Sequence, residues 1–391
     1  MAIASVKDLA LRGKKVLLRC DFNVPLEAGR ITDPARIDAS LETIRYILAE
    51  GAALILCSHL GRPKERTPDL SLKPVAEYLS AALGQKVTLA PDCIGDTTGR
   101  LTRDLQPGTA LLLENLRFHT EEEANDRDFS HELARGKQVY VNDAFGTAHR
   151  AHASTVGVTK FLSERAAGFL MLRELEVLRT VTENPAHPYV AILGGAKVSD
   201  KIGVIRNLLT KVDAILIGGA MAYTFLRARA VPIGKSRLEA DKLQLAAELM
   251  AEASRRNVAF VLPSDHIVAD APEADVQAQS VIQIPPDKMG LDIGPETVAD
   301  FIQRLSTART VIWNGPLGFF EIPAFASGTM RVGQALSQLT DAVTVIGGGD
   351  TAAAVAGQPW AKNFTHISTG GGATLEYLEG ITLPGVLALE T

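Results

Sequence analysis

Residues 15–25 read KVLLRCDFNVP, a short apolar run that stops abruptly at polar residues. The run Lys15–Arg19 has the length of a buried strand, and Asp21 and Asn23 follow directly after it. A segment with apolar residues at helical spacing comes next, over residues 37–48. A strand, a polar turn and a helix in this order are typical of a βα unit in a parallel sheet.

The same pattern recurs along the chain in two series of apolar runs. The first series is Lys15–Arg19, Ala53–Cys57, Lys86–Leu89, Ala110–Leu113 and Gln138–Val141. The second is Tyr189–Leu193, Ala214–Ile217, Val258–Leu262, Thr310–Trp313, Ala342–Ile346 and a weaker run, Phe364–Ile367. Most runs are nearly continuous rather than alternating, which favours strands covered by helices on both faces. Because 391 residues exceed what one hydrophobic core usually organises, the sequence predicts an α/β protein of two domains.

A helical segment joins the two series. Phe169–Thr182 carries leucines and a valine at helical spacing, and Asn184 and Pro185 stop the pattern. The last residues have no strong pattern, and we expect them to pack back on the first domain. The predicted parts are a first domain over 1–170, an interdomain helix over 171–184, a second domain over 185–377 and a C-terminal tail over 378–391.

Composition and charge exclude several classes of protein. Apolar residues make up 46% and charged residues 22%, which is close to average globular usage and excludes a disordered chain. No apolar stretch approaches the roughly 20 residues of a membrane helix, and no secretory signal is visible. The net charge of −5 argues against a nucleic-acid partner bound by bulk charge. We therefore expect a cytoplasmic protein with no membrane or nucleic-acid partner.

The cysteines agree with a reducing compartment. Cys20, Cys57 and Cys93 are odd in number, widely spaced and without a C-x-x-C pair. This pattern favours reduced thiols in hydrophobic cores over disulfides or zinc ligands. We therefore expect any metal to be held by oxygen ligands.

Basic side chains gather after the strands of the first series. They are Arg36, His59, Arg62, Arg117, His149 and Arg150, in the company of Asp21 and Asn23. Ligands of open α/β sheets bind beyond the carboxyl ends of the strands, and guanidinium groups match carboxylates and phosphates bidentately. A single arginine is commonly a solvated surface charge, and a single histidine is as often structural, but neither explains why all of them follow strands. The cluster therefore predicts a site for a small polyanion.

Glycine-rich turns follow the strands of the second series instead. They are Gly194-Gly195, Gly218-Gly219, Asn314-Gly315, Gly347-Gly348-Gly349 and Gly370-Gly371-Gly372. Glycines let backbone N–H groups and helix N-termini approach a ligand, as in nucleotide phosphate sites, although one such turn also serves a tight βα connection. Their repetition in one sheet predicts a nucleotide site.

Charged side chains near these turns are candidates for phosphate and metal contacts. Lys197 and Lys201 are four residues apart, so on a helix they share one face near its N-terminus, where an anion would offset their charges. The alternative is a solvated pair of lysines. Asp350 follows a glycine triplet and is a magnesium ligand, an N-cap or both. Glu321 is a candidate acceptor for ribose hydroxyls.

Two familiar nucleotide motifs are missing. Gly234-Lys235-Ser236 lacks the earlier glycine of a phosphate-binding P-loop, because Arg229 stands five residues before Gly234. The G-x-G-x-x-G dinucleotide fingerprint is absent after the first strand. Its absence counts against a nicotinamide enzyme.

Several strings of the chain resemble motifs of the phosphoglycerate kinase family, in the family's order and over nearly the whole chain. They are Asp21-Phe22-Asn23-Val24-Pro25, Ser58-His59-Leu60-Gly61-Arg62-Pro63, Glu114-Asn115-Leu116-Arg117-Phe118, residues 142–152 (NDAFGTAHRAH), Leu193-Gly194-Gly195-Ala196-Lys197-Val198, Trp313-Asn314-Gly315-Pro316, Gly347-Gly348-Gly349-Asp350-Thr351 and Ser368-Thr369-Gly370-Gly371-Gly372-Ala373. Cys20, Phe319, Phe320, Ile322 and Pro323 depart from the family's usual pattern, which bears on packing at the adenine side rather than on the reaction.

This resemblance implies two Rossmann-like three-layer αβα domains with mainly parallel sheets, joined by a helix and a hinge. It implies reversible phosphoryl transfer between 1,3-bisphosphoglycerate and MgADP, which gives 3-phosphoglycerate and MgATP in glycolysis, with closure of the domains by hinge bending. The implied cofactor is Mg²⁺, the implied co-substrate is ADP or ATP, and the expected state is a monomer.

The resemblance also implies roles for individual residues. Those implied to bind the glycerate substrate are Asp21, Phe22, Asn23, Arg36, His59, Leu60, Gly61, Arg62, Arg117 and Arg150. Those implied to bind the nucleotide are Lys201, Gly219, Gly290, Asn314, Glu321, Gly347, Gly348, Gly349, Asp350 and Thr351, with Asp350 as the magnesium ligand. Those implied to be catalytic are Arg36, Lys197, Lys201, Gly371 and Gly372.

The residue inventory suits phosphoryl transfer, which needs positioning and charge neutralisation rather than a protein nucleophile. An attacking carboxylate is already ionised near neutral pH, so no general base is needed. Two alternatives stay open. A nicotinamide oxidoreductase on the same fold would bind NAD(H) tightly without magnesium, and a binding or scaffold protein would show no turnover.

Overall fold

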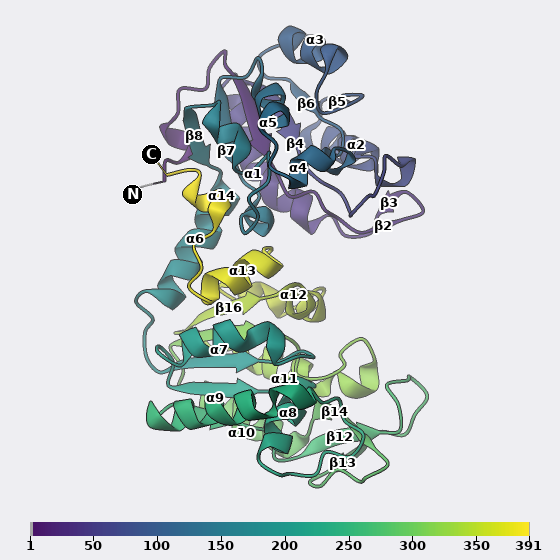
Figure 1. Ribbon diagram of the computed structural model, residues 1–391, viewed down its shortest axis with the longest axis vertical. Coiled ribbons are helices and arrows are strands. Elements are labelled where there is room, and N and C mark those ends of the chain that lie inside the picture. The colour runs from purple at the N-terminus through teal and green to yellow at the C-terminus, as the bar shows by residue number, and fades with distance from the viewer. Residues whose placement is uncertain (1–2, 391) are drawn as a thin grey trace. The chain divides into compact units, whose positions relative to one another are not determined.

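The fold is seen in a computed structural model, which describes residues 3–390. The chain divides into two compact units (Figure 1). The first is Met1–Glu176 with Thr382–Thr391, and the second is Val177–Ile381. Among the described residues, no helix is both long and apolar enough to cross a membrane.

The first unit is built on a six-stranded sheet of order β5-β6-β4-β1-β7-β8. Its strands are β1 (Lys15–Arg19), β4 (Ala53–Cys57), β5 (Val87–Leu89), β6 (Ala110–Leu112), β7 (Val139–Asn142) and β8 (Glu164–Ala167). In β1, Val16 lies opposite Leu54 of β4 and Val139 of β7. All neighbouring strands are parallel, so their carboxyl ends meet at one edge of the sheet.

Helices surround this sheet. They are α1 (Ala35–Ala49), α2 (Lys73–Leu83), α3 (Asp96–Asp104), α4 (Thr120–Glu123), α5 (Arg127–Ala134), α14 (Pro384–Leu387) and the short 3₁₀ helices η1 (Val6–Asp8), η2 (Pro68–Leu70), η3 (Leu116–Phe118), η4 (Phe145–Thr147) and η5 (Gly157–Lys160). A hairpin of β2 (Leu26–Glu27) and β3 (Arg30–Ile31) precedes α1. Val16 and Leu18 of β1 share a core with Ile44 of α1, while Leu17 points to the opposite face and is also fully buried. Burial on both faces explains why β1 is apolar without alternation.

The C-terminal residues from Thr382 belong to the first unit. Gly385 N donates to the Ala148 carbonyl at 2.8 Å, and Arg165 Nη2 donates to the Glu390 carbonyl at 2.7 Å. These bonds attach the end of the chain to η4 and β8.

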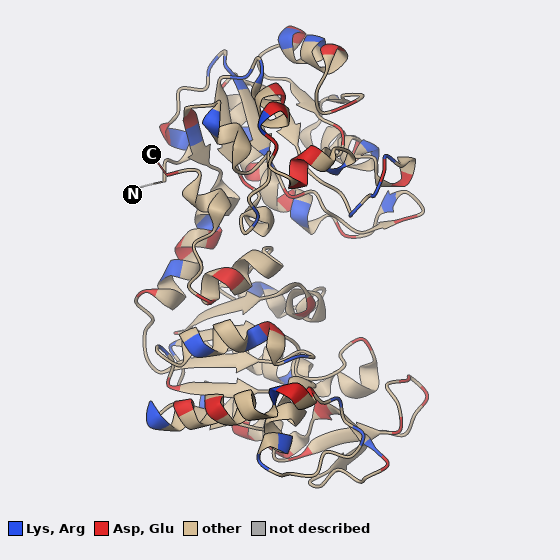
Figure 2. Ribbon diagram, viewed as in Figure 1, with Lys and Arg blue, Asp and Glu red and all other residues tan. Residues whose placement is uncertain are grey.

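The second unit repeats the plan with the strand order β11-β10-β9-β15-β16-β17, again parallel throughout. Its strands are β9 (Tyr189–Leu193), β10 (Ala214–Ile217), β11 (Ala259–Val261), β15 (Thr310–Asn314), β16 (Val343–Gly347) and β17 (His366–Ile367). A separate antiparallel sheet contains β13 (Gln279–Val281), β12 (His266–Ala269) and β14 (Met289–Ile293). In Figure 2 the strands of the main sheet are mostly tan, and the charged residues lie on the helices and loops around them.

The helices of the second unit cover its main sheet on two sides. They are α7 (Ile202–Leu208), α8 (Met221–Ala228), α9 (Leu243–Arg255), α10 (Pro295–Leu305), α11 (Ser327–Leu336), α12 (Gly349–Val355), α13 (Gly371–Leu378) and the 3₁₀ helices η6 (Ser199–Lys201), η7 (Ala240–Lys242), η8 (Pro323–Phe325) and η9 (Ala361–Asn363). Trp313 of β15 packs with Phe301 of α10 and Val332 of α11 in one core. Ile312 points to the opposite face and is equally buried.

The predicted α/β class with mainly parallel sheets is confirmed. Each predicted strand overlaps an observed one, and the predicted helix Phe169–Thr182 is α6 with the same bounds; it begins in the first unit and ends in the second. The sequence pattern did not predict β2, β3, β8 and β12–β14. These are short, polar or antiparallel segments, whereas the apolar runs mark only strands that are buried on both faces.

Candidate functional site

The basic cluster of the first unit starts at the carboxyl end of β1. Asp21 follows β1 and is nearly buried. Its Oδ2 accepts a hydrogen bond from Arg36 Nη1 at 3.2 Å, and its Oδ1 lies 3.9 Å from Nδ1 of His59, which follows β4. Asp21 therefore holds the Arg36 guanidinium, from the first turn of α1, beside the imidazole.

A hydrogen-bonded bridge connects the ends of β1, β4 and β6. Asn23 Oδ1 accepts from Gly61 N at 2.8 Å, and the Gly61 carbonyl accepts from Arg117 Nη1 at 2.6 Å. Arg117 Nε also pairs with Glu123 Oε1 at 2.8 Å. Arg117 is only 8% exposed, so these contacts fix its guanidinium in place.

Several arginines of the cluster act on the buried side chain of His59. Burial lowers this pKa well below its usual value, and four guanidinium charges lower it further, those of Arg19, Arg117, Arg150 and Arg36. His59 is therefore neutral near pH 7. Positive charges gathered around a neutral group favour an anion between them.

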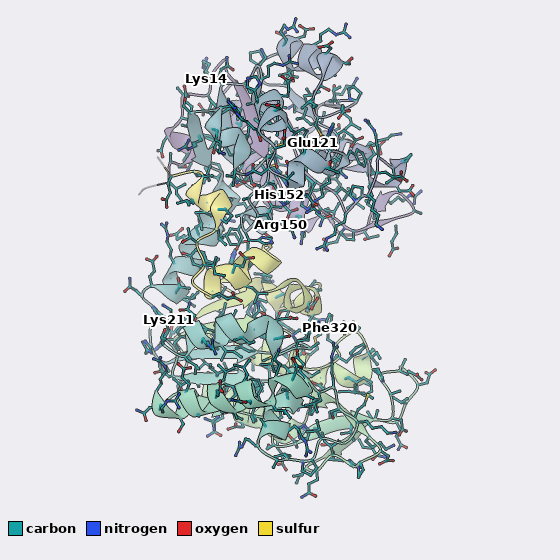
Figure 3. The ribbon with its side chains drawn as sticks, in the orientation of Figure 1. Lys14, Glu121, Arg150, His152, Lys211 and Phe320 are labelled. Atoms are coloured by element: carbon teal, nitrogen blue, oxygen red, sulfur yellow. The ribbon has the colours of Figure 1, made fainter. Side chains whose placement is uncertain are left out.

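Arg62 and Arg150 complete the cluster. Arg62 is exposed, but its charge helps to lower the pKa of Arg117, after the larger effect of burial. Arg150 Nε donates to His149 Nε2 at 3.1 Å. Arg150 and His152 are labelled in Figure 3, and burial followed by the arginine charges lowers the pKa of His152 to about 4. The three histidines of this region thus add no positive charge at neutral pH.

The structure adds Arg19 to the cluster, a residue that the sequence pattern placed only within a strand. Arg19 is 1% exposed, its Nε donates to Ser154 Oγ at 2.8 Å, and its Nη2 lies 3.3 Å from His59 Nδ1. The one signal in the sequence was a charge at the end of an apolar run. Phe22 and Leu60 lie in the hydrophobic core, so their side chains are turned away from a ligand.

In the second unit, the glycine turns after β9, β10 and β15 pack backbone against backbone. Gly195 N donates to the Pro316 carbonyl and Gly219 N to the Leu317 carbonyl, both at 2.9 Å. Gly219 has φ +63°, and a Cβ there would lie 2.5 Å from Gly195 N and 2.6 Å from Gly195 O. The turn leaves no room for a side chain, which explains the glycine.

The Lys201 side chain lies next to Gly195 and Asn314 in these turns. It is 7% exposed, and its Nζ donates to Asn314 Oδ1. Burial lowers the pKa of Lys201, while Asp200 and Asp350 raise it. The predicted helix face shared with Lys197 is wrong: Lys197 is exposed in the loop before η6, because the glycine turn continues past it and the helix starts later.

A third group of turns meets at the start of α12. Asp350 is the second residue of this helix and is exposed. Thr351 Oγ1 accepts from Gly315 N at 2.6 Å, and a Cβ on Gly371 would lie 3.9 Å from Gly349 N. The same turns contain Gly347, Gly348 and Gly372. Turns far apart in the sequence therefore meet near Asp350.

A pocket of about 350 Å³ opens beside these turns. Of the predicted nucleotide residues, those in its lining are Gly219, Gly290, Glu321 and Asp350. Those outside the lining are Lys201, Asn314, Gly347, Gly348, Gly349 and Thr351. Lining residues that the sequence did not point to include Lys235, Arg237, Met289 and Leu291. Phe319 and Phe320, which the sequence connected with packing at the adenine side, also line the pocket, and Phe320 is labelled in Figure 3. Apolar walls with two cations at one pocket suit a planar ring that carries phosphates.

Gly290 lines this pocket and lies directly against the Tyr223 side chain. A Cβ on Gly290 would overlap the Tyr223 hydroxyl, and Gly290 N donates to Ser236 Oγ at 2.9 Å. Ser236 and its neighbours Lys235 and Arg237 are thereby held against β14. No spacing in the sequence indicates this contact, because it depends on the antiparallel sheet.

Asp350 suits a magnesium ion bound together with phosphates. Asp350 and Glu321 are the two carboxylates in the lining of the pocket. Mg²⁺ in nucleotide sites is commonly held by one or two carboxylates, phosphate oxygens and water, and not by an all-protein cage. The residues present therefore fit a metal that arrives with its nucleotide.

Comparisons with known proteins agree with this geometry. The model of the family described as phosphoglycerate kinase matches residues 6–381. A phosphoglycerate kinase of Koribacter versatilis is 55% identical over 403 residues, which cover 100% of this chain and 99% of that protein. A cytosolic phosphoglycerate kinase of Triticum aestivum is 52% identical over 394 residues, covering 100% of this chain and 98% of its own.

A solved structure agrees as well. The phosphoglycerate kinase of Coxiella burnetii superposes with a TM-score of 0.90 at 40% sequence identity, covering 99% of each chain. The chain therefore belongs to the phosphoglycerate kinase family, a family of kinases.

Proposed function

We propose that this enzyme transfers a phosphoryl group reversibly between 1,3-bisphosphoglycerate and MgADP, giving 3-phosphoglycerate and MgATP, as a step of glycolysis. The observation that carries the proposal is the pair of anion sites at the carboxyl ends of two sheets. Four arginine charges act on the buried His59 in the first unit, and Gly195 and Gly219 line a pocket in the second. A reaction between a phosphorylated acid and a nucleotide needs one site for each.

In this proposal the first unit binds the glycerate substrate. Arg36, Arg62, Arg117 and Arg150 bind its phosphate and carboxylate groups, and Asp21 orients Arg36 through the 3.2 Å contact. Asn23 and Gly61 shape the site through their mutual hydrogen bond. His59 stays neutral, so it is free to donate a hydrogen bond without adding charge. Phe22 and Leu60 contribute backbone rather than side chains.

The second unit binds the nucleotide. Residues proposed to contact it are Lys201, Gly219, Gly290, Asn314, Glu321, Gly347, Gly348, Gly349, Asp350 and Thr351. Asn314 Nδ2 supports this role, because it is buried and has no hydrogen-bond acceptor within the described chain. Asp350 would hold Mg²⁺, which when bound neutralises charge on the phosphate oxygens.

The chemistry requires no nucleophile from the protein. A β-phosphate oxygen of ADP attacks the phosphorus of the acyl phosphate. The bond between this phosphorus and the carboxyl oxygen breaks, and 3-phosphoglycerate leaves as a carboxylate that keeps the electron pair. Arg36, Lys197, Lys201 and the backbone N–H groups of Gly371 and Gly372 are proposed to stabilise the charge on the transferred group. A carboxylate is ionised at neutral pH, so the reverse reaction needs no general base.

Direct transfer further requires the reacting atoms to come within roughly 3–3.5 Å. We therefore propose that the domains, taken as 1–170 and 185–377 with the helix 171–184 between them, close by hinge bending around both ligands. Closure would also exclude water that hydrolyses the acyl phosphate. We further propose that the enzyme acts in the cytoplasm as a monomer; the cytosolic relative supports the location.

The test compares two arginines of the same helix. Arg36 faces the cluster, whereas Arg45 is exposed further along α1 and donates to the Ala82 carbonyl at 3.1 Å. A charge-assisted hydrogen bond contributes on the order of 1.5–3 kcal/mol, so Arg36→Ala should raise the KM for 3-phosphoglycerate on the order of 10- to 100-fold. The dissociation constant of MgADP should stay unchanged, and Arg45→Ala should change neither. Loss of MgADP binding in Arg36→Ala with the glycerate KM intact would reverse the assignment of the two units.

A further inference from the structure

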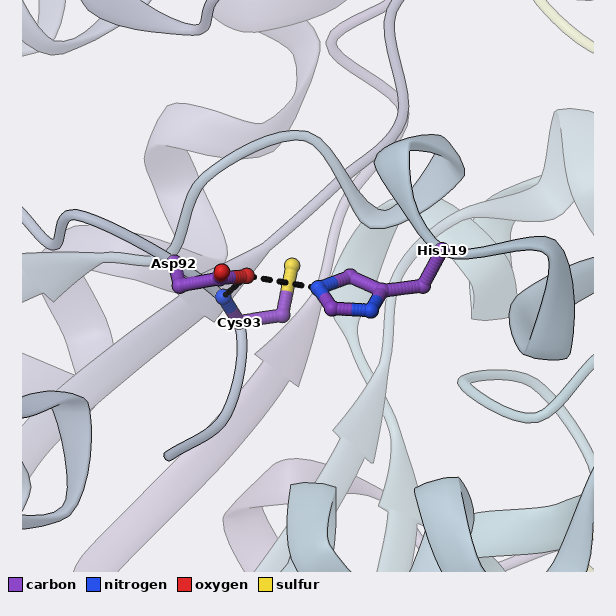
Figure 4. Close-up of side chains that lie close together, drawn as sticks. All are labelled: Asp92, Cys93 and His119. Atoms are coloured by element: carbon purple, nitrogen blue, oxygen red, sulfur yellow. Dashed lines mark hydrogen bonds and ion pairs between the residues drawn. The ribbon is translucent and has the colours of Figure 1, made fainter. Parts of the chain in front are cut away.

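Three side chains with metal-binding atoms converge in the first unit (Figure 4). Asp92 and Cys93 follow β5, and His119 follows η3. One carboxylate oxygen, the Cys93 sulfur and one ring nitrogen all lie within 4.8 Å of one another. Within residues 3–390, no other three His, Cys, Asp or Glu side chains meet this criterion.

Short contacts link the three residues to one another and to their neighbours. Asp92 Oδ1 lies 2.6 Å from His119 Nε2 and accepts from the Cys93 backbone N–H, also at 2.6 Å. The Cys93 thiol donates to the Glu114 carbonyl at 2.9 Å. In Figure 4 the sulfur, the carboxylate and the ring nitrogen point toward one another. A cation that replaced the shared proton would thus meet three ligands already close together.

Neighbouring side chains hold the ligands from outside. Arg66 Nη1 lies 3.2 Å from Asp92 Oδ2, which leaves Oδ1 turned toward His119. The His119 ring packs against Phe129 with 5.0 Å between centroids. Such outer contacts are typical of metal ligands, because they fix the carboxylate and the ring that coordinate the ion.

We propose that Asp92, Cys93 and His119 form a binding site for a thiophilic divalent cation, with Zn²⁺ the ion that this donor set suits best. A thiolate, an imidazole and a carboxylate are all common zinc ligands, and three protein ligands leave a fourth tetrahedral position for water. The Asp92 and His119 side chains are 34% and 22% exposed, so an ion can reach the site from solvent. The site is separate in unit and in chemistry from the oxygen ligands of the nucleotide pocket.

Binding releases protons. A Zn–S bond forms as the Cys93 thiol loses its proton to solvent and gives up its hydrogen bond to Glu114. The sequence pattern favoured a reduced thiol in a hydrophobic core over a zinc ligand, because Cys93 has no second cysteine nearby in the sequence. His119 is far from Cys93 in the sequence and meets it only in the folded chain.

Cobalt reports directly on this site, because a Co²⁺–thiolate bond gives a near-ultraviolet charge-transfer band that oxygen ligands do not give. Titration of the full-length protein with Co²⁺ should produce this band at one equivalent, and added Zn²⁺ should abolish it. Cys93→Ala should lose the band. Cys57→Ala, which removes another fully buried thiol of the same unit, should keep it.

A second variant is needed because Cys93 is buried, and Cys93→Ala could lose the band through unfolding. His119→Gln changes a partly exposed side chain, and it should weaken the Zn²⁺ affinity at least about tenfold while thermal unfolding shows an intact fold. Zn²⁺ alone should raise the unfolding temperature of the unmodified protein and not that of His119→Gln. Absence of the band in the unmodified protein, its persistence in Cys93→Ala, or equal Zn²⁺ affinity in His119→Gln would each overturn the proposal.

Discussion

Substitution of Gly219 by alanine tests whether the close approach of the glycine turns forms the nucleotide pocket. With φ +63° at this position, a non-glycine residue costs about 1–2 kcal/mol in the left-handed conformation alone. The new Cβ would also lie 2.5 and 2.6 Å from the Gly195 backbone and 2.9 Å from the Pro316 carbonyl oxygen, against at least 3.4 Å for ordinary contact. These neighbours are backbone atoms, so they cannot rotate away.

The turns must therefore move apart. Overpacking of this kind costs about 1–3 kcal/mol, so together with the backbone term Gly219→Ala should destabilise the second unit by about 2–5 kcal/mol. Gly195, Gly219 and Ala220 all line the pocket, and their displacement should weaken nucleotide binding by at least about tenfold, or about 1.4 kcal/mol.

The matched control is Gly357→Ala in the same unit. Gly357 has φ +74°, and a Cβ added there would have no neighbouring atom within 4 Å, so this substitution carries the backbone cost without the overlap. It should cost about 1–2 kcal/mol and leave nucleotide affinity unchanged.

The assay follows from the positions of the tryptophans. Both of them, Trp313 and Trp360, lie in the second unit, so urea unfolding followed by their fluorescence reports on this unit. Calorimetric titration with ADP and Mg²⁺ gives the affinity. Equal losses of stability in Gly219→Ala and Gly357→Ala, with equal ADP affinity, would refute the reasoning from backbone contact.

Three other experiments test the buried Lys137, the proposed magnesium ligand Asp350 and the proposed closure of the domains. Burial lowers the pKa of Lys137 to about 8, from 10.5 in an exposed amine, so the charged form is disfavoured in the native state. Lys137→Met should therefore raise the free energy of unfolding of the first unit by on the order of 1–3 kcal/mol below pH 8, and this gain should disappear between pH 8 and 10.5. Hydrogen exchange measures the gain, and Lys64→Met, at an exposed lysine, should show no such pH dependence. Asp350→Asn should raise the Mg²⁺ concentration that half-saturates activity by about tenfold or more, and an unchanged requirement would remove Asp350 from the metal site. Small-angle scattering should show a smaller radius of gyration with 3-phosphoglycerate and a nucleotide together than with either alone, and an unchanged radius at demonstrated saturation would exclude closure.

Much of the fold follows from local sequence, because a strand buried on both faces is apolar on both of them and does not alternate between apolar and polar residues. That requirement marks β1, β4, β9 and β10, whose observed bounds equal the predicted ones. The edge strand β8, with Glu164 and Arg165 at its start, has no such mark. The antiparallel strands β12 to β14 pair across loops, so their partners cannot be found from periodicity.

Some residues of the candidate sites can likewise be predicted from the sequence, and others are brought together only by the fold. Glycines at strand ends are visible in the sequence because a close backbone approach excludes any Cβ, and the motif around Asp21 and His59 identifies the family. Only the folded chain brings Arg19 to His59, places Lys235 and Arg237 at the pocket of the second unit, and brings Cys93 close to His119. Sequence spacing predicts contacts within one element, where geometry is periodic, but contacts between elements depend on sheet order and loop path, which only tertiary packing sets.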